Sequence, residues 1–286
     1  MTQITATAVK SLRDRTGAGM MDCKRALEEA AGDEEKAIDI LRQRGAAKAA
    51  KRSARETTEG TLAIARHPDA GSAAMAELAS ETDFVARNEE FLGVAERAAR
   101  AALDAPLPNG EVVGGGALLD LPEHADLSDE LNELRGKIGE NIQLVRVVRF
   151  APAPQGTVGS YLHFGNRIGV LVELGGAAPS QAVSGLARDL ALHIAAAAPI
   201  GIAPDDIPKT ERERERAVLT EQARQEGKPP AIVQKIVEGR LRKYYEQNAL
   251  LLQGFVKDPD IRIESLLHGV SPDLSVRRFV RFEVGA

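Results

Sequence analysis

The segment GTVGSYLHFGNRIGVLVELGG, residues 156–176, is a second copy of GTLAIARHPDAGSAAMAELAS, residues 60–80. The alignment has no gap, and it pairs Gly60 with Gly156, Thr61 with Thr157, His67 with His163, Glu77 with Glu173, and Leu78 with Leu174. Each copy predicts a β-hairpin, because two strand-like apolar runs flank a turn; in the second copy the strands are 158–164 and 168–174. The repeat therefore predicts two related units in series.

An amphipathic helix is predicted after each hairpin, because apolar residues recur there at helical spacing. The apolar positions are Phe91, Val94, Ala95 and Ala98 in the first unit, and Val183, Leu186, Leu190 and Ile194 in the second. We therefore expect an α+β protein whose core has two repeated subdomains with antiparallel sheets. A helix over 128–138 and a strand over 142–150 complete the first subdomain, residues 60–151, and the glycine-rich stretch 107–128 is expected to be a mobile loop.

The second subdomain is predicted to comprise residues 152–207 and 246–286, with 208–245 inserted between its parts. The insertion begins with a charged helix that must stop at GKPP, residues 227–230, because proline cannot continue the hydrogen-bond ladder. A second helix follows with an apolar stripe, Ile232, Val233, Ile236, Val237, Leu241 and Tyr244. These features predict an inserted antiparallel helical hairpin. The tail is predicted to form a helix over 261–267 and a final strand over 276–284 with one solvated face.

The N-terminal residues 1–45 predict a compact unit of three short helices, separated at glycines. Residues 46–59 carry small and basic residues without a bulky hydrophobe, and we interpret them as a linker rather than a helical extension. Four basic residues there, Lys48, Lys51, Arg52 and Arg55, are candidates for RNA contact. A solvated charge run is the commoner explanation of such a segment.

The composition argues against several classes of protein. The chain has 37 basic and 42 acidic residues, so no global basic field attracts nucleic acid. The single cysteine, Cys23, excludes an internal disulfide and a cysteine-rich metal site, as expected in a reducing compartment. There is no membrane-length apolar run, and the start of the sequence does not resemble a signal peptide. We therefore expect a cytoplasmic protein.

Sequence patterns for catalysis are also missing. The chain has no phosphate-binding loop, dinucleotide fingerprint, zinc-protease helix or nucleophile elbow. Its five histidines are scattered; His67 and His163 fall beside the predicted turns, and His193 falls within an alanine-rich helix. We therefore predict a binding protein rather than an enzyme, with no catalytic residue, metal or cofactor.

The stretch ETDFVARNEEF, residues 81–91, raises a separate question. Phe84 lies among residues typical of an exposed turn or helix start, in a chain with only seven phenylalanines. Its ring either returns to the core, as most aromatic rings do, or is displayed for a partner.

Two stretches, LRDRTGAGMMDCKRAL at 12–27 and ELASETDFVARNEEF at 77–91, resemble the signature segments of the bacterial elongation factor Ts family. That family comprises nucleotide exchange factors for elongation factor Tu. The resemblance continues in order through KIGENI, GSYLHFGNRIGVLVEL, GKPPAIVQKIVEGRL and RFEVG, and so covers nearly the entire chain. It implies a ubiquitin-associated type of module at the N-terminus, a core of two subdomains and an inserted helical hairpin.

The resemblance also implies the residues that contact the partner. By this similarity Thr82, Asp83, Phe84 and Val85 press against the GTPase domain, displace Mg²⁺ and promote GDP release. The factor then stays on the nucleotide-free partner until GTP binds. Other implied contacts are Arg13, Met20, Met21 and Lys24 in the N-terminal module, Ile138 and Gly139 in KIGENI, and His163. Met20 has an equally good alternative role, which is to close the three-helix core.

Some expectations remain open at this stage. The hairpin is a candidate for a homodimer interface or for a partner contact. Many family members continue beyond the RFEVG strand into a further helical module, whose contacts do not carry over to a sequence ending at Ala286. An RNA-binding or ribosome-associated protein that uses residues 48–55 is the second hypothesis, and an enzyme is the third.

Overall fold

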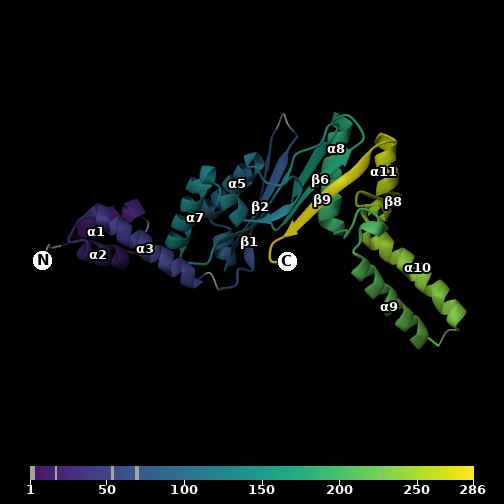
Figure 1. The fold of residues 1–286 in the computed structure, drawn as a ribbon, viewed down its shortest axis with the longest axis horizontal. Helices are drawn as coiled ribbons and strands as arrows, with labels where there is room; N and C mark the ends of the chain where they lie inside the picture. Colours follow the sequence, from purple (N-terminus) through teal and green to yellow (C-terminus); the bar gives the residue numbers. More distant parts are fainter. Residues whose placement is uncertain (1–3, 17, 53–54, 68–70, 228) are drawn as a thin grey trace.

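A computed structural model describes residues 4–16, 18–52, 55–67, 71–227 and 229–286, without the side chains of 45–52 and 231. The molecule is elongated (Figure 1). Three N-terminal helices lie at one end, two long helices, α9 and α10, project at the other, and the β-sheets lie between them. The chain returns to the centre after α9 and α10, because its last strand joins a central sheet and the C-terminus lies there.

Two antiparallel sheets form the centre of the molecule. The first has the order β1-β2-β4-β3, with β1 Glu59–Arg66, β2 Ala73–Ser80, β3 Val112–Gly114 and β4 Gln143–Phe150. The second has the order β5-β6-β9, with β5 Thr157–Leu162, β6 Ile168–Gly175 and β9 Ser275–Glu283. A small two-stranded sheet, β7 Gly254–Phe255 and β8 Asp258–Arg262, precedes the final helix.

The strand register confirms the internal repeat. Thr61 lies opposite Leu78 in the first hairpin, and the aligned residues Thr157 and Leu174 lie opposite each other in the second. Strands β2 and β6 also shift their register, against β4 and β9, directly after the aligned glutamates, Glu77 and Glu173. The second hairpin differs in one detail, because β5 ends at Leu162 rather than at the predicted residue 164.

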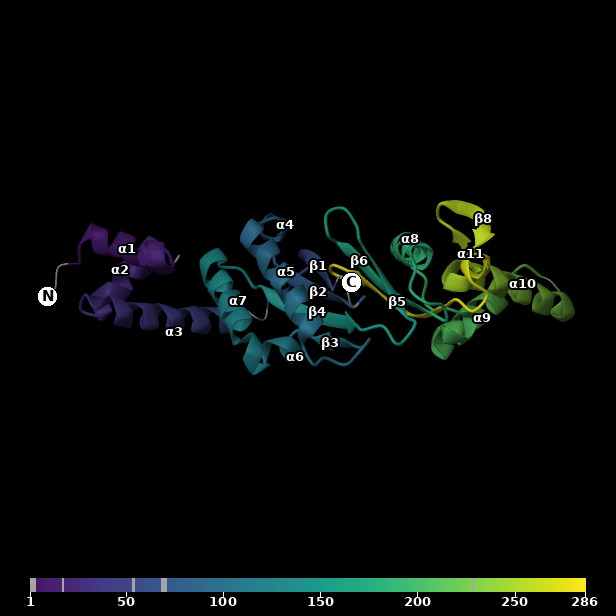
Figure 2. The same ribbon diagram turned by 90° about the horizontal axis from the view of Figure 1, so that it is seen from above.

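The core is built in four layers (Figures 1 and 2). Helices α5 Glu89–Asp104 and α7 Ala125–Ile138 cover the outer face of the first sheet, and α8 Gln181–Ala197 covers that of the second. Successive strand residues point to opposite faces. Thus Leu62 packs between the sheets whereas Ala63 packs under the helices of the first subdomain. The inner faces of both sheets share one apolar cluster, which includes Met75, Phe150, Leu171 and Phe282.

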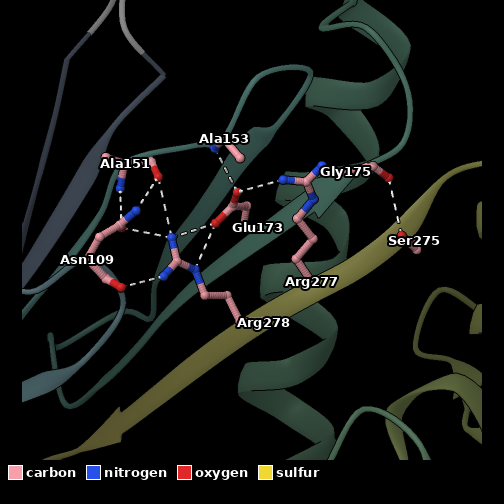
Figure 3. Close-up of polar contacts among 8 residues, drawn as sticks. All are labelled: Asn109, Ala151, Ala153, Glu173, Gly175, Ser275, Arg277 and Arg278. Atoms are coloured by element: carbon pink, nitrogen blue, oxygen red, sulfur yellow. Dashed lines mark hydrogen bonds and ion pairs between the residues drawn. The ribbon is translucent and has the colours of Figure 1, made fainter.

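A polar network closes the junction between the two subdomains (Figure 3). Glu173 is 2% exposed, and its carboxylate accepts hydrogen bonds from Arg278 at 2.7 Å and from the backbone N–H of Ala153 at 3.0 Å. Arg278 also donates to the backbone oxygen of Asn109 at 2.7 Å, which belongs to the first subdomain. A buried carboxylate needs partners of this kind because burial removes its hydration.

The prediction that the final strand has one solvated face was wrong. Arg278 on β9 lies over the ring of Phe150, and Arg281 donates to the backbone oxygen of Ala195 at 3.4 Å. Phe279 packs on the α8 side and Phe282 between the sheets. Side chains on both faces of β9 therefore pack against other elements, and Arg278 and Arg281 are partly buried groups with partners, whereas Arg277 is exposed.

The N-terminal unit consists of α1 Ala6–Thr16, α2 Met20–Glu29 and α3 Glu34–Arg52. Its helices pack around Leu12, Cys23 and Leu27, which are at most 1% exposed. Helix α3 continues through residues 46–52, so the first half of the predicted linker is a helical extension. Its far end lies against α7, which places the three-helix unit beside the first subdomain (Figure 2).

The segment 107–128 was predicted to be a loop, and it contains regular structure instead. Strand β3 pairs with β4, and α6 Gly116–Leu119, the 3-10 turn Pro122–His124 and the start of α7 follow. Leu118 is fully buried in the first subdomain core. The sequence did not predict these elements, because they are too short to show a periodic pattern of apolar residues.

The inserted residues form two helices, α9 Lys209–Gln225 and α10 Pro230–Asn248, which pack side by side (Figure 1). Leu219 and Ala223 of α9 meet Val233, Val237 and Leu241 of α10. The predicted stripe is correct at these α10 positions and at Ile236, but Ile232 is exposed, and Tyr245 rather than Tyr244 packs in this cluster. The remaining elements are the 3-10 turns Pro204–Asp206 and Leu250–Leu252, and α11 Ile263–Val270 in place of the predicted helix 261–267.

Candidate functional site

Phe84 is carried by α4, a single helical turn, Asp83–Ala86, between β2 and α5. Thr82 before this turn is extended, with φ −128° and ψ 154°. Asn88 after it caps α5, since its side-chain oxygen accepts from the backbone N–H of Glu90 at 2.9 Å. The two flanking residues thus limit α4 to one turn at the end of the first subdomain.

One turn of helix presents neighbouring side chains to opposite surroundings. Val85 is buried in the first subdomain core, whereas Phe84 is 84% exposed. Phe91, the other aromatic residue of this stretch, is fully buried under the sheet. The alternative of a core position for Phe84 is therefore excluded. Asp83 beside it accepts from Arg87 at 3.0 Å, and both of these side chains face solvent to a large extent.

The end of α7 meets the start of α4. Gly139 ends α7 in the left-handed conformation, φ 86°, and its N–H donates to the backbone oxygen of Arg135 at 3.1 Å. The chain then places the Glu140 carboxylate under Thr82, whose hydroxyl donates to it at 2.7 Å. Two segments predicted separately, 82–85 and 138–139, are therefore neighbours. Ile138 itself is half-buried against the core rather than displayed.

A second set of contacts ties this place to Arg55, in the segment that follows α3. The Glu81 carboxylate accepts from the Asn141 backbone N–H at 2.6 Å and pairs with Arg55 at 3.3 Å. The Asn141 side chain donates to the backbone oxygen of Arg55 at 2.8 Å. Arg55 is thus engaged within the protein, which weakens the RNA hypothesis. The side chains of Lys48, Lys51 and Arg52 lie outside the described residues.

His163 lies in the turn between β5 and β6. Its Nδ1 is 2.9 Å from the hydroxyl of Tyr161, and its backbone N–H donates to Ile168 at 2.8 Å, which closes the turn. The backbone oxygen of Asn166 accepts from Leu62 of β1 at 2.8 Å, so the turn of the second subdomain rests on the first. Figure 2 shows α4 and this turn on the same side of the sheets.

The sequence interpretation missed Phe164, which is 97% exposed at this turn. It was placed at the end of the predicted strand 158–164. The available signal was the following GNR turn, since a strand cannot continue into residues that close a tight turn. Glu140 was also missed, although it falls within the KIGENI stretch.

The remaining predicted residues lie on the three-helix unit, away from α4. Met20 and Met21 begin α2 and are 54% and 61% exposed, and Lys24 one turn later is exposed as well. Arg13 on α1 is also exposed. The alternative in which Met20 closes the three-helix core is therefore excluded.

The structure also bears on the other classes of function. Among the residues that it describes, no group of three or more His, Cys, Asp or Glu side chains could hold a metal ion. Nor does any helix in this described part have the length and apolar character to cross a membrane. A groove between β1 and α5 contains His67 and Asp104, whose side chains lie 2.7 Å apart and are largely exposed. His193, by contrast, is a buried residue that hydrogen-bonds Gln253 at 2.9 Å.

Comparison with known proteins identifies the family. Residues 81–286 match the family model described as Elongation factor TS. The chain is 40% identical to elongation factor Ts of Chlorobium phaeobacteroides, with all of both chains covered. It is 45% identical to that of Alkalilimnicola ehrlichii, with 99% of this chain and 92% of the relative covered, and 44% identical to that of Aquifex aeolicus, with 97% and 96% covered. The chain therefore belongs to the elongation factor Ts family.

Proposed function

We propose that this protein is a guanine-nucleotide exchange factor of translation elongation. It binds elongation factor Tu in its GDP-bound form, promotes GDP release and stays on the nucleotide-free partner until GTP binds. The proposal includes a cytoplasmic location. It includes no covalent chemistry, cofactor or direct contact with nucleic acid.

The observation that carries this proposal is the exposed ring of Phe84 on a short, tethered turn. Aromatic side chains are mostly buried, so a ring that is 84% exposed is suited to contact a partner protein. Its transfer into an apolar crevice of the partner contributes about 1.5–3 kcal/mol. Family membership supplies the identity of the partner, since the segment 81–91 lies within the matched region.

The proposed mechanism is displacement rather than bond chemistry. Thr82, Asp83, Phe84 and Val85 act as a wedge against the loops of the GTPase that hold Mg²⁺ and the phosphates of GDP. These loops tolerate little movement, because Mg²⁺ requires near-ideal octahedral geometry. Loss of the ion leaves the phosphate charges poorly compensated, and GDP dissociates.

Exchange is a coupling between two binding events on the partner. The exchange protein binds nucleotide-free elongation factor Tu more tightly than the nucleotide-bound form. By reciprocity, it lowers the affinity of elongation factor Tu for the nucleotide by the same ratio. It accelerates exchange in both directions, so the cellular concentrations of GTP and GDP determine the direction.

Other surfaces extend the proposed interface. Arg13, Met20, Met21 and Lys24 dock the three-helix unit, a ubiquitin-associated-like module, onto the GTPase domain; exposed flexible methionines suit such a contact. His163, with the exposed ring of Phe164 beside it, and the corner at Ile138 and Gly139 complete the surface. The functional units in this proposal are 1–45, 60–151, the discontinuous 152–207 with 246–286, and the hairpin 208–245.

The hairpin is the proposed homodimer interface. Val218 and Ile232 expose apolar side chains on α9 and α10, at 44% and 48%. Replacement of both by glutamate should convert a dimer to a monomer in analytical ultracentrifugation if the hairpin mediates self-association. An unchanged sedimentation coefficient would exclude this interface.

The exchange activity is tested by stopped-flow release of fluorescent GDP from elongation factor Tu. The wild-type protein should accelerate release, and the double variant Asp83→Ala, Phe84→Ala should lose most of this acceleration while keeping its fold. A matched control is Val112→Ala, which removes apolar atoms from another exposed position of the first subdomain. Undiminished release with the double variant would disprove the wedge, and no acceleration by the wild type would disprove the exchange function.

A further inference from the structure

We propose that Glu140 is a positioning residue that holds the Phe84 segment in the conformation that presents the ring. This inference rests on the proposed function and adds to it the residue on which the geometry of the wedge depends. It comes from the hydrogen bonds between the end of α7 and the start of α4.

Three donors converge on the Glu140 carboxylate. Its Oε2 accepts from the backbone N–H of Glu81 at 3.2 Å and from that of Thr82 at 3.1 Å. Its Oε1 accepts from the Thr82 hydroxyl at 2.7 Å. These donors belong to the two residues directly before α4, so one side chain restrains the backbone through which Phe84 is attached.

The residue type matches this arrangement. An ionised carboxylate only accepts hydrogen bonds and has two oxygens, so it satisfies three donors at once. Thr82 stands at the N-cap position of α4, and its hydroxyl bonds to Glu140 in place of a cap bond. Glutamine would offer one accepting oxygen and place an amide donor against the remaining donor, which loses at least part of the arrangement.

Glu140 is itself held in place by its neighbours. Gly139 directs it toward Thr82 through the left-handed end of α7. Lys137, one turn earlier, pairs with Glu90 at the start of α5. In the reverse direction, the backbone N–H of Asn141 donates to Glu81 at 2.6 Å. The two segments therefore clamp each other, each accepting backbone N–H groups of the other.

This clamp matters because Phe84 cannot position itself. Its ring is exposed, and within α4 the buried contact is Val85. A wedge that moves freely would have to be ordered on binding, at a cost in conformational entropy, whereas a restrained one is preorganised. Loss of Glu140 should therefore slow nucleotide exchange because Phe84 is less well positioned, and not because Glu140 itself contacts the partner.

The test combines a measurement on the free protein with one on the complex. In the Glu140→Ala variant, the amide protons of Glu81 and Thr82 should exchange with solvent at least about tenfold faster by NMR. GDP release from elongation factor Tu should slow by about tenfold as well. The Glu140→Gln variant should lie between wild type and alanine in both measurements. Glu133→Ala removes an exposed carboxylate on α7, the helix that ends just before Glu140; it is the matched control and should change neither.

The double variant Glu140→Ala, Phe84→Ala distinguishes a positioning role from a merely structural one. If Glu140 acts through the ring, its loss should have no further effect on GDP release once Phe84 is already alanine. Additive losses, or unchanged exchange of the Glu81 and Thr82 amides, would overturn the inference. If Glu140→Ala does not fold, Thr82→Val removes the hydroxyl bond alone and should give a smaller change with the same dependence on Phe84.

The outcomes separate this inference from the proposed function. Suppose that amide exchange is faster in Glu140→Ala but that the wild-type protein does not accelerate GDP release. This result would refute the exchange function and leave the restraint by Glu140 in place. Active wild type with unchanged GDP release in Glu140→Ala, despite faster amide exchange, would refute the positioning role alone.

Discussion

The guanidinium of Arg146, on β4 of the first subdomain, lies over the ring of Phe282 on β9 of the second, 4.2 Å from its centre. The reciprocal contact also exists, since Arg278 of β9 lies 4.5 Å from the ring centre of Phe150 on β4. Arg146 pairs with Glu77, and Arg278 pairs with Glu173, the aligned glutamate of the other repeat. The repeated sequence therefore makes a repeated contact that joins the subdomains in both directions.

This junction predicts a large loss of stability when one arginine is removed. Arg278→Met should lower the free energy of unfolding by about 3 kcal/mol, because it leaves the buried Glu173 carboxylate without its main partner. Urea denaturation measures the change. Arg277→Met is the control: it is more exposed and 3.9 Å from Glu173, so it should cost less than about 1 kcal/mol. Equal losses in the two variants would contradict this account of the junction.

The two phenylalanines of the 81–91 stretch should respond oppositely to mutation. Phe84→Ala should change the free energy of unfolding by less than about 0.5 kcal/mol, because the ring faces solvent. Phe91→Ala should cost about 3–5 kcal/mol, because it leaves a cavity beneath the first sheet. Both are read from urea denaturation of the free protein. A destabilising Phe84→Ala would show that its ring packs on the protein in solution.

Stability should depend on pH through His193. Burial lowers the pKa of His193 in the folded protein, and the hydrogen bond with Gln253 opposes this shift. The unfolded chain therefore takes up a proton first, near pH 6.5. The stabilising contribution of His193 is complete above about pH 6.5 and is lost as the pH falls through the lower folded pKa.

The measurement compares wild type with His193→Gln, which cannot take up that proton. The free energy of unfolding of wild type should fall relative to that of the variant between about pH 7 and pH 5. A constant difference over this range would mean that the folded pKa is not lowered.

Cys23 should react slowly with thiol reagents. It is fully buried between the N-terminal helices, and burial raises its thiol pKa, while the nearby Thr16 hydroxyl opposes the shift. Reaction requires opening of the three-helix unit, and an opening that costs about 3 kcal/mol slows modification by roughly 100-fold. Because the chain has one cysteine, the absorbance change with Ellman's reagent reports this unit alone. A rate equal to that of the denatured chain would contradict the packing.

Local patterns in the sequence were sufficient for much of the fold. The repeat predicted both hairpins and the helix after each, and the structure places aligned residues opposite each other in both sheets. Hairpins and amphipathic helices are readable in this way because their periods, two and about 3.6 residues, are local properties of the chain. The resemblance of two segments to a family was equally local, and the comparisons confirmed the family.

Two of the failures concern residues whose surroundings are supplied by distant parts of the chain. The arginines of β9 resembled a solvated face, but Arg278 lies over a ring of the neighbouring sheet, and Arg281 donates to α8. Segment 107–128 resembled a loop, but β4 provides a partner strand for β3. Burial of a strand face and pairing with another strand are both tertiary properties, which the pattern of residues along one segment does not report.

The sequence by itself determined the repeat, the helices, the family and the stretch that contains Phe84. Only the tertiary structure decided that this ring points outward while Phe91 points inward, and that Glu140 meets Thr82 across 58 positions of sequence. The physical reason is that a side chain's exposure and its hydrogen-bond partners depend on which segments the packed core brings together.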